Sequence, residues 1–433
     1  MNVIVEKQPK SQVKLTVELT VEQMQPYLER AAEDLSTEHK IEGFRPGKAS
    51  LGIVVQKIGA QAVWEAAAEH AVRKTFVKAI VEHKLKSVGQ PSVSIMKLAP
   101  ENPFVYAAQV AVLPEVTLNE YKTFSTKPTP VVLKPEQIDK GIGELQTMFA
   151  TEALADRSAA MGDKVEVDFH VTVDKVPLEN GSSKQHPVML GSKNFIPGFE
   201  EQIVGLKKDD QKTFELQFPK EYHNAQVAGK RAEFFVTVRS VFQVTKPEVN
   251  DDFAKKAGTF ANLAALRTQI EKNLQAEAQQ VEDGKFERAL LDELIKRTKF
   301  TDLPDLLIDS ELSKMLHELQ EEVLRQGGIK WEDYLTGIKK TEDELKKEFQ
   351  PQAERRVKSA LIIRTIAERE NVTVEGAAVE DEVQATLKVY DNNPEVRERI
   401  DTPDYRDYVR GLMINRRVIE MIKGWATATP EKK

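Results

Sequence analysis

The start of the chain changes from a strand-like to a helix-like spacing of apolar residues. Apolar and polar residues first alternate with the period of a half-buried strand at Val13, Leu15, Val17 and Leu19. Thr20 then stands three residues before Gln23, the spacing of a helix-capping box, and apolar residues recur at helical intervals through Leu35. We therefore expect a strand that leads directly into a helix.

The same two spacings continue to about residue 113. Helical periodicity covers roughly residues 50–84, and strand-like alternation follows around 92–96 and 104–112. We interpret residues 1–113 as one small α/β domain with its helices on one face of a sheet.

Residues 114–150 have the composition of a linker between domains. Proline, which removes an amide donor and favours extended backbone, recurs among Val, Thr and Lys residues at Pro114, Pro128, Pro130 and Pro135. We predict an extended linker here, with a helix from Pro135 to about residue 155.

The remaining chain divides into a β-rich part and a helical part. Short alternating segments separated by glycines predict an antiparallel sheet domain over residues 151–246. Amphipathic helical stripes fill residues 247–433, with helix ends expected at Pro304, Gly327, Pro351, Gly376 and Pro394. The fold class is therefore multidomain α+β: a small α/β head, an antiparallel β domain and an elongated all-α body with arms.

The amino-acid composition excludes several classes of function. The 433 residues include no cysteine, which excludes disulfides, cysteine nucleophiles and cysteine metal sites. The formal net charge of −7 argues against nucleic-acid binding through the global field, so such binding needs a local basic patch. Because we find neither a signal peptide nor an apolar run long enough to span a bilayer, we expect a cytoplasmic protein.

The segment Gly43–Lys48 is the most informative short motif. It differs from a phosphate-binding loop, because three residues separate its glycines and Ala49 follows Lys48. One interpretation is a basic turn whose Phe44 folds back onto the core. The other is a docking tip, in which Arg45 and Lys48 meet phosphate or acidic groups while Phe44 enters an apolar niche.

This loop resembles the ribosome-docking signature of the trigger factor family of bacterial chaperones. Four positions match the family motif, Gly43, Phe44, Arg45 and Gly47, while Ser50 stands where the family usually has proline. The resemblance implies that the loop, with Lys48, contacts ribosomal protein and RNA of the large subunit beside the exit tunnel.

A second motif, Asn194-Phe-Ile-Pro-Gly-Phe-Glu200, resembles FKBP-type prolyl isomerases. The resemblance implies an FKBP-like domain with an aromatic cradle formed by Phe169, Ile196, Phe199, Tyr222 and Phe234, and with Glu179 at the acidic position. Leu178 and His186 stand where family members with good activity usually carry phenylalanine. The resemblance thus implies prolyl isomerase activity that is reduced here.

Taken together, the two motifs imply an ATP-independent chaperone for nascent and unfolded polypeptides. Its partners would be the ribosome and client chains, with no membrane, no cofactor and no metal, and a homodimer away from the ribosome stays open. His317 and Glu321 on one helix lack the second histidine of a zinc-protease motif. A stand-alone prolyl isomerase with a helical partner-binding or dimerisation scaffold is the main alternative, and an export chaperone is a weaker one.

Overall fold

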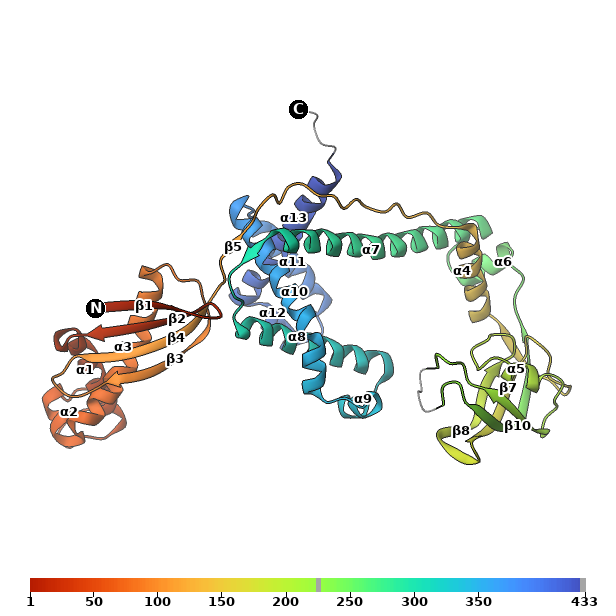
Figure 1. Cartoon of the computed structure of the whole chain (residues 1–433), viewed down its shortest axis with the longest axis horizontal. Coiled ribbons are helices and arrows are strands. Elements are labelled where there is room, and N and C mark those ends of the chain that lie inside the picture. The colour runs from red at the N-terminus through yellow and green to blue at the C-terminus, as the bar shows by residue number, and fades with distance from the viewer. Residues whose placement is uncertain (223–226, 429–433) are drawn as a thin grey trace. The chain divides into compact units, whose positions relative to one another are not determined.

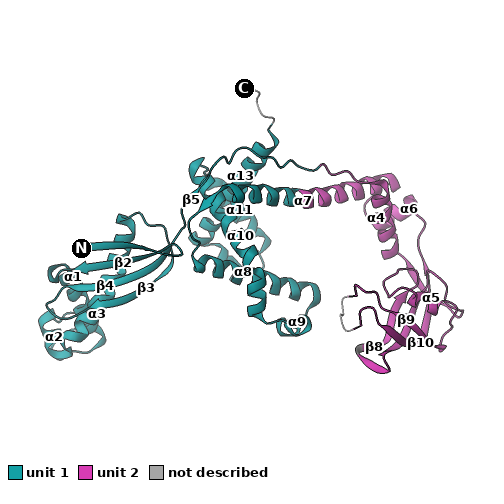
Figure 2. Ribbon diagram, viewed as in Figure 1, with its two compact units in different colours: residues 1–129, 283–433 teal, residues 130–282 magenta. Residues whose placement is uncertain are grey.

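The computed structural model describes residues 1–222 and 227–428, which form two compact units. One unit comprises residues 1–129 and 283–433, and the other comprises residues 130–282 (Figure 2). The expected fold class is confirmed: an α/β head, an antiparallel sheet region and a helical body are all present.

The head is an antiparallel sheet with helices on one face (Figure 1). Its strands follow the order β1-β2-β4-β3. The head elements are β1 (Asn2–Gln8), β2 (Gln12–Leu19), α1 (Val21–Glu38), α2 (Leu51–Ile58), α3 (Ala60–Glu82), β3 (Ser87–Lys97) and β4 (Phe104–Val112). The predicted capping box is present at Thr20 and Gln23, whereas β1 was not predicted.

Alternation along β2 and β4 places one row of side chains in the head core. In β2 this row is Val13, Leu15, Val17 and Leu19, all of which are buried. On β4 the ring of Tyr106 is buried too, and its hydroxyl lies 2.8 Å from the Thr75 hydroxyl of α3. A buried hydroxyl is costly without such a partner, so this contact fixes α3 over the sheet.

The helical body belongs to the same unit as the head. Its elements are β5 (Val116–Thr117), the end of α7 (Leu263–Arg297), β11 (Lys299–Phe300), α8 (Asp305–Gly327), α9 (Trp331–Ile338), α10 (Glu342–Arg369), α11 (Gly376–Val389), α12 (Pro394–Ile400) and α13 (Pro403–Thr427). Leu290, Leu294, Ile362, Ile366 and Val418 form the centre of its largest apolar cluster.

The prediction that a helix ends at Pro351 is wrong, because α10 continues through it. An interior proline costs about 3 kcal/mol through its missing donor and its clash with the preceding turn. On either side of it, Phe349 and Ala353 pack against Leu312 and Met315 of α8. This packing on both halves offsets the local penalty.

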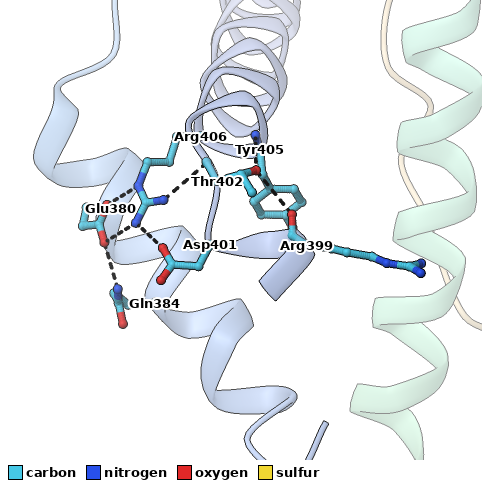
Figure 3. Close-up of polar contacts among 7 residues, drawn as sticks. All are labelled: Glu380, Gln384, Arg399, Asp401, Thr402, Tyr405 and Arg406. Atoms are coloured by element: carbon cyan, nitrogen blue, oxygen red, sulfur yellow. Dashed lines mark hydrogen bonds and ion pairs between the residues drawn. The ribbon is translucent and has the colours of Figure 1, made fainter. Parts of the chain in front are cut away.

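A polar cluster centred on Arg406 joins α11, α12 and α13 (Figure 3). Its guanidinium donates to Glu380 at 2.9 and 3.2 Å and to Asp401 at 2.8 Å. Hydrogen bonds that Arg406 and Gln384 donate to the Glu380 carboxylate lower its pKa. Beneath the cluster, Val383 and Val409 are buried, so the polar contacts and an apolar contact hold the same helices.

Residues 118–127 cross the body without regular secondary structure and are held by side chains. The carboxylate of Glu293 accepts hydrogen bonds from the backbone amides of Ser125 and Thr126 at 2.9 and 3.1 Å. The hydroxyls of the same two residues donate to it at 2.9 and 2.7 Å. Farther along, the Lys127 ammonium donates to the carbonyl of Ala426 at 2.6 Å. We call this segment the strap.

Exposed polar contacts connect the head to the body. The turn between β1 and β2 contacts the start of α8, where Lys10 lies 2.6 Å from Asp305. Lys86 lies 2.8 Å from Glu368 of α10. A cavity of about 560 Å³ lies between these contacts and is lined in part by Lys10, Lys84, Lys86, Leu361 and Glu368.

The second unit contains the antiparallel sheet domain. Its strands follow the order β6-β10-β7-β8, and β9 pairs with β10. The elements are α4 (Pro135–Met148), β6 (Thr151–Leu154), β7 (Lys164–Val173), β8 (Val176–Met189), α5 (Phe199–Ile203), β9 (Gln211–Gln217), β10 (Arg231–Thr245), α6 (Asp251–Ala257) and the start of α7. The helix expected to reach about residue 155 ends at Met148, because residues 151–154 pair with β10 instead.

Within residues 1–222 and 227–428, no helix is both long and apolar enough to cross a bilayer.

The Glu293 contacts predict a pH-dependent stability of the body. Burial alone would raise the pKa of Glu293, but hydrogen bonds from Ser125 and Thr126 outweigh it and lower the pKa from 4.5 to about 2. The contribution is therefore complete above pH 4.5 and is lost as the pH falls towards 2. We expect Glu293→Gln to reduce the free energy of unfolding near neutral pH by about 2–3 kcal/mol.

Urea unfolding followed by circular dichroism measures this effect. Glu271→Gln, an exposed position on the same helix, is the matched control and should leave the midpoint unchanged. The difference between wild type and Glu293→Gln should shrink at about pH 3, because the wild-type carboxylate then loses its advantage. Equal midpoints near neutral pH would contradict the proposed contribution.

Candidate functional site

Phenylalanine rings from several elements meet in the core of the sheet domain. Phe199 of α5 is 1% exposed, and its ring centroid lies 5.5 Å from that of Phe234 on β10 and 5.7 Å from that of Phe214 on β9. Phe214 and Phe234 stack on each other at 5.7 Å with an interplanar angle of 9°. These rings form the floor of what we call the aromatic cluster.

The other predicted cradle residues adjoin this floor. Phe169 of β7 meets Phe199 edge to face at 6.3 Å, and Tyr222 lies 4.8 Å from Phe218, which in turn contacts Phe234. Ile196 and Leu178 are partly buried against the same core. The structure thus brings the predicted apolar and aromatic cradle residues together. The backbone of Glu179 lies in β8, but its side chain is outside what the structure describes.

Two rings that sequence reasoning did not place in the cradle also belong to the cluster. The ring of His186 lies 5.6 Å from that of Phe169 and 5.6 Å from that of Phe195, edge to face in both cases. Phe195 stacks flat on Phe199 at 4.8 Å. The position of Phe195 next to Ile196 in the quoted motif was the signal that could have identified it.

A bulge in β8 gives His186 its position. Val167 pairs with His186 and Phe169 pairs with Ser183, so two residues of β8 lie opposite the single residue Asp168 of β7. The Asp168 carboxylate accepts the amide of Gln185, inside the bulge, at 2.7 Å. That hydrogen bond, followed by those from Arg239, lowers the pKa of Asp168, so the carboxylate is charged near neutral pH.

A buried carboxylate holds the loop before α5. Glu200 is 5% exposed and accepts the amide of Gly191 at 2.6 Å and the amide of Asn194 at 3.1 Å. The Ser192 hydroxyl donates to it at 3.3 Å. Burial raises the pKa of Glu200, but the amide hydrogen bonds outweigh burial and leave the pKa below its ordinary value. The backbone that leads to Phe195 is therefore fixed.

The predicted docking loop joins α1 to α2 in the head. Phe44 is 40% exposed and is not part of the apolar cluster of the head, which favours the docking tip over a ring that folds back onto the core. Arg45 and Lys48 are exposed as well, and neither forms an ion pair within the described part of the chain. The loop thus presents one aromatic ring between two cations.

Glycine and serine define the geometry of this loop. Gly47 has a φ of +74°, and a Cβ atom there would lie 3.0 Å from the Thr37 hydroxyl oxygen, so a side chain would be strained. Ser50, the N-cap of α2, has a φ of −68° and a ψ of 155°. Since proline fixes φ near −65°, Ser50 keeps the exit geometry that a proline would give.

The described residues contain no group of three or more histidine or carboxylate side chains that could hold a metal ion. The pair noted in the sequence, His317 and Glu321, is exposed with its Nε2 and Oε1 atoms 3.4 Å apart.

Comparisons with known proteins cover most of the chain. Residues 1–145 match the family described as bacterial trigger factor protein, residues 262–424 match its C-terminus, and residues 155–239 match FKBP-type peptidyl-prolyl cis-trans isomerase. Trigger factor of Moorella thermoacetica is 33% identical over 396 residues, which cover 91% of this chain and 88% of that protein.

Two further matches cover a similar share of the chain. Trigger factor of Carboxydothermus hydrogenoformans is 33% identical over 391 residues, which cover 90% of this chain and 91% of that protein. A solved structure described as "Promiscuous Substrate Recognition in Folding and Assembly Activities of the Trigger Factor Chaperone" has a TM-score of 0.48 and 19% identity, covering 98% of this chain and 99% of that one.

The contacts of Glu200 predict that a charge-neutral variant at this position loses hydrogen bonds and stability. Glu200→Gln replaces one acceptor oxygen by a donor, which leaves buried amides without a partner and costs about 1–3 kcal/mol. Hydrogen exchange should become faster at the amides of Gly191 and Asn194, the groups that donate to this carboxylate. Glu201→Gln, at the exposed neighbouring position, is the control. Unchanged exchange at both amides in Glu200→Gln would show that Glu200 does not hold the loop.

Proposed function

The chain belongs to the trigger factor family, and from this premise we propose that it is a ribosome-associated, ATP-independent chaperone that binds nascent polypeptides at the exit tunnel. The observation that carries the proposal is the exposed loop Gly43–Lys48 on a head that matches the family. The coarser assignment, a trigger factor chaperone with an FKBP-type domain, follows from family membership itself.

The loop suits a docking role on chemical grounds. An exposed phenylalanine gives up water when it enters an apolar niche, and this burial contributes about 1.5–3 kcal/mol. Arg45 and Lys48 complement ribosomal phosphates or acidic side chains, and their attraction falls as salt screens it. Gly43 and Gly47 supply positive φ angles that keep the tip tight. The partners we propose are therefore large-subunit protein and RNA.

We propose a division of labour along the chain. Residues 1–113 dock on the ribosome, residues 114–150 connect, residues 151–246 isomerise prolyl bonds and residues 247–433 hold clients. Separate apolar clusters support this division: one is confined to the head and another to the sheet domain.

The helical part has apolar side chains available for clients. Leu324 and Ile329 are exposed where α8 meets α9, and Val389 and Tyr390 are exposed at the end of α11. Because the hydrophobic effect is non-directional, such surfaces bind many unfolded sequences weakly. Weak binding lets a client leave without an energy source.

The aromatic cluster supports the proposed prolyl isomerase activity. The barrier to X-Pro isomerisation is about 18–20 kcal/mol, and the amide loses its conjugation at the top of it. A dry aromatic surface that binds the twisted amide better than the planar one lowers this barrier without a nucleophile. We propose that Phe169, Ile196, Phe199, Tyr222 and Phe234 form that surface. The non-aromatic Leu178 and the polar ring of His186 make the activity lower than in family members with phenylalanine there.

The docking proposal predicts loss of ribosome binding in a double variant. Phe44→Ala with Arg45→Ala removes the ring and a charge-assisted contact of about 1.5–3 kcal/mol, so affinity should fall at least tenfold. Co-sedimentation with 70S ribosomes at two salt concentrations measures the effect. Wild-type binding should weaken at higher salt, and the variant's residual binding should depend less on salt.

Lys74→Ala with Val77→Ala is the matched control. It removes an exposed cation and an exposed apolar side chain from α3 of the same head. Equal co-sedimentation of wild type, control and loop variant would remove the docking assignment.

The isomerase proposal predicts a graded loss of turnover. Tyr222→Ala or Phe234→Ala should lower kcat/KM in a protease-coupled prolyl peptide assay by about tenfold, since each removes about 1.4 kcal/mol of ring contact. Phe235→Ala is the control, because Phe235 is exposed on the other face of β10 and contacts His170 instead of the cluster. Absence of turnover in the wild-type chain would leave the domain as a fold without this activity.

A further inference from the structure

The floor ring of the proposed prolyl site is covered by a neighbour in the same chain. Phe199 is 1% exposed, although a prolyl ring can use it only if one face is open. Phe195 lies flat on it, with centroids 4.8 Å apart and an interplanar angle of 14°. A ring in this position occupies the space that a stacked prolyl ring would take.

The other neighbours of Phe199 cannot act as removable covers. Phe214 and Phe234 are 8% and 5% exposed and belong to paired strands in the sheet core. Phe169 is half-buried, but it lies in β7, which pairs with β10 on one side and β8 on the other. Phe195, in contrast, is half-buried and lies in a loop before α5. It is therefore the stacked neighbour that can turn out towards water without disrupting the sheet.

The covering position is held by side chains. His186 meets the Phe195 ring edge to face at 5.6 Å with an angle of 88°, and it meets Phe169 in the same way on its other side. Edge-to-face pairs contribute beyond their buried area. The bulge that carries His186 is in turn fixed by the Asp168 carboxylate through the Gln185 amide.

The backbone beneath Phe195 is fixed as well. Glu200 accepts the amides of Gly191 and Asn194, so the loop that precedes Phe195 is tied to α5. Exposing Phe199 therefore requires rotation of the Phe195 side chain about its own torsions rather than movement of the loop.

We propose that Phe195 is an intramolecular occupant of the prolyl-binding site, which covers Phe199 in the unliganded chain and turns away when a prolyl ring binds. The inference rests on the proposed isomerase function. It makes Phe195 a residue that sets the affinity of the site, because each substrate must displace a ring that the chain itself supplies. His186 is a positioning residue that acts through Phe195.

A covering Phe195 ring should weaken the apparent affinity for prolyl peptides. When only a fraction of the molecules is open, the apparent dissociation constant equals the intrinsic constant divided by that fraction. If about one molecule in ten is open, removing the cover tightens binding about tenfold. The bound complex is unaffected, so KM should fall by a similar factor while kcat stays the same.

The experiment compares wild type with Phe195→Ala and Phe195→Leu in the full chain. A proline-containing tetrapeptide is titrated while the methyl signals of Ile196 report binding at this site, and the same proteins enter the protease-coupled assay. We expect both variants to bind the peptide about threefold to tenfold more tightly. His186→Ala should produce a smaller change in the same direction, because it only loosens the cover. Phe235→Ala, an exposed phenylalanine away from the cluster, should match wild type.

Each outcome decides between the proposals. Weaker or unchanged binding in both Phe195 variants, with unfolding midpoints close to wild type, overturns the covering role; weaker binding would make Phe195 a wall of the site. Tighter binding with no turnover in any protein supports the cover and contradicts the isomerase function. Turnover in wild type together with weaker binding in the variants contradicts the cover alone. Absence of binding at Ile196 in every protein contradicts both.

Discussion

The strap depends on side chains for the hydrogen bonds that its backbone cannot form by itself. Every buried amide and carbonyl needs a partner, yet residues 118–127 belong to neither a helix nor a sheet. Glu293 accepts two of its amides, and Arg297 and Arg369 donate to the carbonyls of Thr123 and Leu118. With its polar groups satisfied, the strap can contribute apolar side chains to the core of the body. A connection between domains thereby becomes part of a domain.

Much of the fold could be predicted because hydrophobic spacing and capping are local properties. The β2 alternation and the Thr20 cap needed no information beyond a few neighbouring residues. β1 was missed because its stability comes from pairing with β2, where Val3 faces Val17. The predicted helix end at Pro351 was wrong for a related reason, because packing of α10 against α8 outweighs a local helix-breaking signal. In both cases a contact with another element, and not the local sequence, decided the structure.

The candidate site, like the fold, could be predicted only in part from the sequence. The resemblance identified residues such as Phe199 and Phe234, and the structure brings these two rings within 5.5 Å of each other. It could not reveal which ring covers which, because that depends on a bulge in β8 and on a carboxylate, Asp168, in the neighbouring strand. His186 therefore looked like the loss of an aromatic residue, whereas its ring contacts Phe169 and Phe195. In the docking loop, Ser50 looked like a departure but has the backbone angle of a proline.

Separate cores are compatible with the several weak activities that we propose for this chain. The head, the body and the sheet domain each bury their own apolar cluster, and the contacts between head and body include exposed ion pairs such as Lys10 with Asp305. Exposed ion pairs add little stability, so each core is stable mainly through its own packing. A change in the loop Gly43–Lys48 should therefore leave the aromatic cluster intact, and a change in the cluster should leave the head intact. A chaperone that must release its clients benefits from this arrangement, because each contact can be weak without weakening the fold that presents it.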